Sequence, residues 1–172
     1  ITKAMADYEV LLEPDENTPE WWAGAPSILL DEDGTFYMAT RMREGSSVRG
    51  RRGYENRILK SSDGKKFETI AQMKRDEVGI PGFERPALVK DPNSGKYRLY
   101  FCSGIEGGWS ILRFDDADDP SQFDPRKWKP VLRPEQHTDV FSHLRGYKDP
   151  FIFFLDGLWH MFVIGQYAQE RI

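Results

Sequence analysis

A short pattern occurs three times in this chain, and the repetition limits the folds that the chain can adopt. Each copy has a proline, an apolar run, a turn glycine, an aromatic residue two positions later and an apolar residue two positions further on. The copies run over residues 26–38, 86–99 and 150–161. Their prolines are 60 and then 64 residues apart. A repeat of this length in strand-rich segments is typical of β-propeller blades.

Each copy is expected to begin a unit of four antiparallel strands. In the first unit, residues 27–30 and 35–40 are predicted to pair as a hairpin, because an Asp-Gly turn between apolar runs favours one. A second strand pair is expected at 57–62 and 67–70. The predicted blades cover residues 22–72 and 82–133, followed by an incomplete blade over 146–172. The alternative is a β-sandwich whose hairpins resemble one another by coincidence.

The third unit stops where its third strand is expected to begin, because residues 170–172 align with residues 56–58 of the first unit. Propellers typically close with about four to eight blades, and an open array leaves strand edges unpaired. We therefore expect either that this sequence is part of a longer chain, which we favour, or that a partner or a second copy supplies the missing blades. The first residue is Ile1, not methionine, which also favours a missing N-terminus.

Composition argues against several classes of protein. The net charge is −4 with mixed signs, which disfavours a general nucleic-acid binder. No apolar run approaches the roughly 20 residues needed to cross a membrane. Cys102 is the single cysteine, so no internal disulfide can form. The start of the sequence shows no signal-peptide pattern, and a cytoplasmic location is the expectation.

Three segments resemble motifs of the five-bladed propeller glycosidases. Residues 148–153, Lys-Asp-Pro-Phe-Ile-Phe, look like their Arg-Asp-Pro type motif, and residues 83–86, Phe-Glu-Arg-Pro, are similar to their Glu-x-Pro motif. Residues 61–67 resemble their Ser-x-Asp-Gly-x-x-Trp/Phe outer hairpin. These enzymes include glycoside hydrolase family 43, the invertase-like enzymes and the mannoside phosphorylases of family 130. The resemblance implies an all-β, five-bladed propeller, partial or split, that acts on glycosidic bonds of an oligosaccharide.

The resemblance also implies two carboxylates in the axial funnel of the propeller. Glycoside hydrolysis needs one carboxyl group to protonate the leaving oxygen and another to activate water or attack the sugar. Glu84 is the expected proton donor, and Asp149 is expected to orient the sugar or tune the donor. In family 43 the first blade supplies an aspartate before its proline, but this chain has Ala25 there. Three explanations are open: the missing carboxylate lies in absent blades, the reaction differs from that of family 43, or the site is not catalytic. The alternative for Glu84 and Asp149 is a purely structural role, bonding backbone amides.

Aromatic and basic residues supply candidate sugar contacts. Trp21 and Trp22 precede the first inner strand, where they are expected either to stack on a sugar or to join the core. Residues 41–52 form an arginine-rich and glycine-rich segment that we predict to be a flexible loop, with Arg41 and Arg43 nearest the funnel. Such a loop would bind phosphate or an acidic sugar, or would simply be solvated. Further expected contacts are Arg85, Lys148 and His143.

Three other functions remain open from the sequence. A glycoside phosphorylase would use the arginine segment to hold phosphate. A non-catalytic carbohydrate-binding propeller is favoured by Ala25, and a protein-interaction scaffold would have no sugar affinity. No cofactor is expected, because zinc-type ligand spacing is missing and, although an axial calcium ion would fit some relatives, nothing in the sequence requires one.

Overall fold

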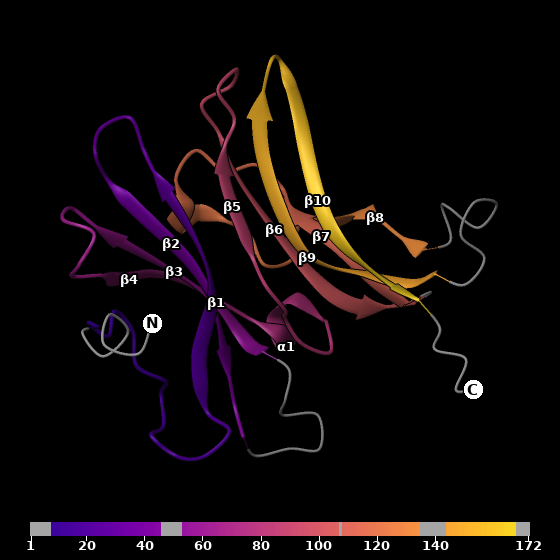
Figure 1. Ribbon diagram of the computed structural model, residues 1–172, viewed down its shortest axis with the longest axis horizontal. Coiled ribbons are helices and arrows are strands. Elements are labelled where there is room, and N and C mark those ends of the chain that lie inside the picture. Colours follow the sequence, from indigo (N-terminus) through magenta and orange to yellow (C-terminus); the bar gives the residue numbers. More distant parts are fainter. Residues whose placement is uncertain (1–7, 46–52, 107, 135–143, 168–172) are drawn as a thin grey trace.

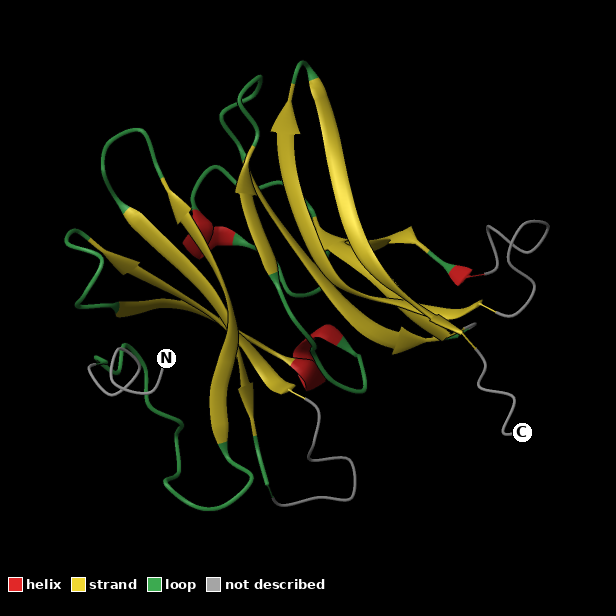
Figure 2. Ribbon diagram, in the orientation of Figure 1, coloured by secondary structure: helices red, strands yellow, loops and turns green. Residues whose placement is uncertain are grey.

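The computed structural model describes residues 8–45, 53–106, 108–134 and 144–167. Nearly all of its regular structure is β-sheet, which confirms the all-β prediction (Figures 1 and 2). Two short helical segments, α1 (Arg75–Val78) and η1 (Pro120–Gln122), connect strands. Within the described ranges, no helix is long and apolar enough to cross a membrane. The strands are β1 (Trp22–Leu30), β2 (Phe36–Arg43), β3 (Gly53–Ser61), β4 (Glu68–Lys74), β5 (Ala87–Lys90), β6 (Tyr97–Ile105), β7 (Gly108–Phe114), β8 (Trp128–Leu132), β9 (Leu144–Leu155) and β10 (Leu158–Tyr167).

The first sheet contains β1, β2, β3 and β4 in chain order, and each neighbouring pair is antiparallel. The turn between β1 and β2 is closed by a hydrogen bond from the Asp31 N–H to the Thr35 carbonyl (2.8 Å). Glycine recurs at one turn position in all three copies of the sequence pattern because the backbone there is left-handed. The φ angles are 85°, 70° and 80° at Gly34, Gly95 and Gly157.

The second sheet joins one complete unit to a two-stranded third unit. Strands β5, β6, β7 and β8 pair antiparallel in chain order, as β1 to β4 do. The β9–β10 hairpin meets β7 through a parallel bridge between Trp109 and Gly146. A Cβ atom on Gly146 would lie 2.4 Å from the Cβ of Trp109, so glycine is needed where these strands meet.

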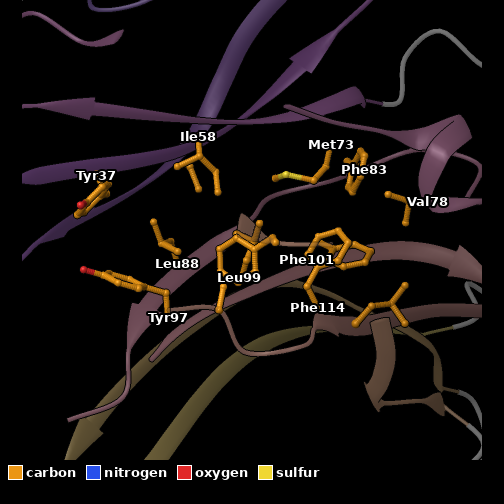
Figure 3. Close-up of a cluster of buried hydrophobic side chains, with 14 of the residues drawn as sticks. Tyr37, Ile58, Met73, Val78, Phe83, Leu88, Tyr97, Leu99, Phe101 and Phe114 are labelled. Atoms are coloured by element: carbon orange, nitrogen blue, oxygen red, sulfur yellow. The ribbon is translucent and has the colours of Figure 1, made fainter. Parts of the chain in front are cut away.

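A first hydrophobic core lies between the two sheets (Figure 3). Ile58 and Met73 point from the first sheet toward Leu99 and Phe101 of β6. Phe83, from the connecting segment, packs edge-on against Phe101 with ring centroids 5.3 Å apart. The burial of these large side chains holds the two sheets together.

A second core lies on the other face of β6, because side chains alternate along a strand. Tyr100 and Cys102 pack there against Tyr147 and Ile152 of β9. The opposite face of the β9–β10 hairpin, which we call the outer hairpin face, stays open in the described structure. Five of its large apolar side chains are 53% to 65% exposed, namely Phe151, Leu155, Leu158, Phe162 and Ile164.

Residues 8–21, the N-terminal segment, run along the first sheet on the side away from the second sheet (Figure 1). Asp15 accepts hydrogen bonds from both terminal nitrogens of the Arg57 guanidinium (3.0 and 2.8 Å). The Tyr54 hydroxyl also donates to Asp15, and Arg57 is further paired with Glu55 (2.6 Å). The segment is thereby fixed to a buried charge network.

Strand β2 continues through Arg43, so the prediction of a loop beginning at Arg41 is wrong. Arg41 pairs with Gly24 on β1 and with Asn56 on β3, and Arg43 pairs with Trp22. Backbone pairing on both sides overrides the loop-like composition of the segment. The rest of that segment, residues 46–52, lies outside the described residues.

Candidate functional site

The first strands of the three units, β1, β5 and β9, surround one open cavity. The cavity has a volume of about 270 Å³ and is lined by all three strands. Strand β5 is bonded to β1, since the Leu88 N–H donates to Ser27 Oγ (3.0 Å). Ser27, Arg85 and Pro150 lie toward one end of the cavity, where each strand begins its apolar run. The predicted acidic residues adjoin this end, which we call the funnel entrance.

Glu84, in the segment before β5, forms an ion pair with Arg41 of β2. The Arg41 side chain is 8% exposed and the Glu84 side chain 19% exposed, so solvent and salt screen the pair weakly. Burial and the neighbouring Arg43 lower the pKa of Arg41 to about 10, while Cys102 and Asp149 act in the opposite direction. Arg41 therefore remains protonated at neutral pH.

Both predicted carboxylate residues are attached to Cys102 on β6. The Glu84 N–H donates to the Cys102 carbonyl (2.9 Å), and the backbone of Asp149 hydrogen-bonds to the Cys102 thiol. Burial raises the pKa of Cys102 to about 12, so the thiol is neutral and unsuited to nucleophilic chemistry. The sequence contains no signal that Cys102 joins Glu84 to Asp149.

Gly53 determines how closely Arg41 and Glu84 approach each other. A Cβ atom at Gly53 would lie 2.5 Å from Arg41 Cγ and 2.8 Å from the Phe83 carbonyl oxygen. Gly53 and Phe83 also exchange two backbone hydrogen bonds (2.9 and 2.8 Å). Because Phe83 directly precedes Glu84, this glycine positions both sides of the ion pair. No pattern in the sequence predicted this contact.

The two adjacent tryptophans have different surroundings. Trp22 is 43% exposed, and the guanidinium carbons of Arg41 and Arg43 lie 5.3 and 5.0 Å from its ring centroid. Trp21 packs against Tyr54, with ring centroids 5.7 Å apart and an interplanar angle of 59°. Both line an open cleft of about 320 Å³ together with Arg43. Trp22 is thus better placed than Trp21 to stack on a sugar. The stacking itself stays a prediction.

The remaining predicted contacts are distributed unevenly. Lys148 Nζ lies 4.0 Å from the centroid of the Trp109 ring. Arg85 lines the cavity, and its buried Nε has no hydrogen-bond partner among the described residues. His143 lies outside the described residues. In the same described part of the chain, no cluster of three or more His, Cys, Asp or Glu residues could hold a metal ion.

Ala25 occupies the position in the first unit that Asp149 occupies in the third. Both residues precede a proline and have a left-handed backbone, with φ of 54° and 53°. Strand pairing is irregular at both places, between Gly24 and Ser27 on β1 and opposite Asp149 on β9. Glu84 differs, because it stands before β5 and not within a strand.

Comparisons with known proteins identify the fold. No protein-family model matches the sequence, and no curated protein matches it either. Solved structures do match. An exo-β-1,3-galactanase from Phanerochaete chrysosporium, bound to β-1,3-galactotriose, has a TM-score of 0.60 and 16% identity over 92% of this chain and 35% of its own.

Two further structures show the same relationship. A GH43_1 enzyme from Xanthomonas citri, complexed with xylotriose, has a TM-score of 0.55 and 17% identity over 81% of this chain and 38% of its own. An α-L-arabinofuranosidase from Clostridium thermocellum has a TM-score of 0.54 and 19% identity over 87% of this chain and 43% of its own. The chain has the fold of part of a family 43 five-bladed β-propeller. It spans 35% to 43% of the length of these three structures.

Proposed function

We propose that this chain forms part of a carbohydrate-active propeller that binds an oligosaccharide at the funnel entrance and hydrolyses a glycosidic bond. The observation that carries the proposal is the arrangement around Arg41, which contacts Glu84 and is attracted by Asp149. Two carboxyl groups near one cavity are what glycoside hydrolysis requires. The oligosaccharides bound to two of the matched structures support the same class of ligand.

The surroundings of the carboxyl groups suit a sugar. Sugar rings have apolar faces that stack on exposed aromatic rings, and their hydroxyls need charged or amide partners. Trp22 offers an exposed ring at the funnel entrance, while Glu84, Asp149 and Lys148 offer polar groups from the other two units. These residues come from separate units of the repeat, so the site depends on the packing of the sheets.

Oligosaccharide titrations test the proposal. The purified chain is titrated with β-1,3-galactotriose, xylotriose and arabinotriose by isothermal calorimetry, and products are separated by chromatography. We expect binding of at least one sugar and its hydrolysis, with hydrolysis lost in Glu84→Gln and Asp149→Asn. Glu68→Gln, an exposed change on β4, is the matched control and should leave both properties unchanged. If none of the three sugars binds, the proposal is wrong and the interaction-scaffold hypothesis takes its place.

The second candidate is a propeller that binds a sugar without cleaving it. Ala25 favours it, because the position equivalent to Asp149 carries no carboxylate. Binding without turnover, unchanged in Glu84→Gln, would support this candidate over hydrolysis. Turnover that requires inorganic phosphate would instead identify a phosphorylase.

A further inference from the structure

The burial of Arg41 favours a role other than the direct substrate contact that the sequence predicts. Its side chain is 8% exposed. Its aliphatic part packs so closely against Gly53 that a Cβ atom there would lie 2.5 Å from Arg41 Cγ. The Trp22 ring lies beside its guanidinium group. Its Nε is buried and has no hydrogen-bond partner among the described residues. A buried cation is costly unless it is paired. Glu84 is the ion-pair partner of Arg41, so Arg41 is expected to act through its effect on Glu84.

Charged groups from several elements lie near Arg41 and Cys102, the two residues that contact Glu84. Arg43 and Asp149 interact electrostatically with Arg41, Lys148 and Asp149 interact with the Cys102 thiol, and Arg85 follows Glu84 in the chain. The Cys102 thiol on β6 is neutral. Among the described side chains, Glu84 is in direct contact with a cation, whereas no ion pair of Asp149 occurs.

A carboxyl group in direct contact with a cation ionises more readily than one without such a partner. We infer that Arg41 is a positioning residue that holds the Glu84 carboxylate at the funnel entrance and keeps it ionised. This assignment differs from the role of proton donor that the sequence predicts for Glu84. Its catalytic meaning rests on the proposed function, whereas the charge state of Glu84 can be measured without any sugar.

Carbon-13 NMR of the Glu84 carboxyl group tests the inference. The chain is labelled with ¹³C-glutamate, the Glu84 signal is assigned with Glu84→Gln, and the pH is varied from about 3 to 8. We expect the pKa of Glu84 in the unmodified chain to lie below the ordinary value of about 4.3. In Arg41→Met this pKa should rise by about 1 to 3, and Arg41→Lys should restore most of the difference. If the pKa of Glu84 in the unmodified chain is 4.3 or higher, the inference is wrong, even where Arg41→Met fails to fold.

Arg98→Met is the matched control. Arg98, near the start of β6, is also a largely buried arginine, and it is paired with Asp91 (2.6 Å) and Asp116 (3.1 Å). Replacing Arg98 should leave the pKa of Glu84 unchanged. If the pKa of Glu84 rises equally in Arg41→Met and Arg98→Met, the rise reflects general destabilisation of the fold and not the loss of the Arg41 contact. Where hydrolysis is measurable, the acidic limb of the pH profile should move to higher pH in Arg41→Met, because Glu84 then needs a higher pH to ionise. If no sugar binds, the proposed function is wrong, but the measured effect of Arg41 on the pKa of Glu84 is unaffected.

Discussion

Ala25 and Asp149 share one left-handed backbone conformation, with φ of 54° and 53°, at equivalent positions of the first and third units. Left-handed backbone is unfavourable for most residues, and Asn and Asp tolerate it better than Ala does. The first unit therefore has a backbone suited to an aspartate but carries an alanine. The absence of a carboxylate at this place follows from the side chain alone and not from a different local fold.

Ala25→Asp is predicted to be accepted by the fold and to place a third carboxyl group at the funnel entrance. The change in the free energy of unfolding should stay within about 0.5 kcal/mol, because the left-handed position tolerates Asp. We expect the rate of glycoside hydrolysis to increase, measured by product chromatography beside thermal unfolding. Ala25→Asn is the control, since it matches the shape without the charge. A large loss of stability in both variants would contradict the equivalence with Asp149.

The local parts of the fold could be predicted from the sequence. The turn at Gly34 and the hairpin around it depend on residues that are neighbours in the chain, so pattern and turn chemistry are sufficient. The repeat then predicted where the corresponding turns at Gly95 and Gly157 lie. The positions of the strands in the described units follow from these local signals.

The ion pair between Arg41 and Glu84 could not be predicted in the same way. Arg41 lies in the first sheet and Glu84 in the segment before β5. Their approach depends on Gly53, whose role is visible only after the sheets have packed. The amino-acid composition around Arg41 is typical of a loop, but backbone pairing with the residues around Gly24 extends strand β2 through Arg43. Long-range packing, and not local propensity, determines the geometry of the site.

Gly53→Ala is predicted to destabilise the chain and disturb the candidate site. The new Cβ would meet Arg41 Cγ at 2.5 Å and the Phe83 carbonyl oxygen at 2.8 Å, and a backbone atom cannot move away easily. We expect a loss of about 1–3 kcal/mol in the free energy of unfolding, measured by urea denaturation. Gly24→Ala is the control, because its Cβ would meet Trp22 at an ordinary 3.4 Å. Equal stability of both variants would show that Gly53 has more room than the structure indicates.

Asp31 is predicted to make the packing of the two sheets sensitive to acid. Its carboxylate accepts hydrogen bonds from Lys90 Nζ (2.6 Å) and from the Tyr97 hydroxyl of the second sheet. Burial alone would raise the pKa of Asp31, but the bonds from Lys90 and Tyr97 outweigh it and lower the pKa. Its stabilising contribution is therefore present above the unfolded pKa of about 3.9 and is lost as the pH falls through the folded value.

Asp31→Asn should lower the free energy of unfolding by about 1–3 kcal/mol at neutral pH, because it leaves Lys90 without its carboxylate. It should also flatten the dependence of stability on pH below about pH 4. Urea unfolding at several pH values measures both effects. Glu32→Gln, an exposed change in the same turn, is the control and should preserve the acid sensitivity. An unchanged pH dependence in Asp31→Asn would exclude Asp31 as its source.

The N-terminal segment is predicted to detach in acid before the sheets unfold. The hydrogen bond from Arg57 lowers the pKa of Asp15, burial opposes it, and Tyr54 adds to the lowering. The attachment is thus retained above the unfolded pKa of about 3.9 and lost as the pH falls through the lowered value. Hydrogen exchange should show residues 8–21 losing protection in acid, and Asp15→Asn should show the same loss at neutral pH. Asp76→Asn, at a 93% exposed side chain, is the control; full protection in Asp15→Asn would refute the prediction.

The outer hairpin face is predicted to make the isolated chain self-associate. Five large apolar side chains lie exposed there, and contiguous exposed apolar surface of this kind drives association. The chain spans less than half of the propellers that it matches, so much of their length has no counterpart here. Sedimentation velocity should show association that increases with protein concentration, and Phe162→Lys combined with Ile164→Lys should reduce it without lowering the melting temperature. Ile152→Lys, on the covered face of the same hairpin, should instead destabilise the fold. A monomeric chain at all concentrations would show that this face, although apolar, does not drive association.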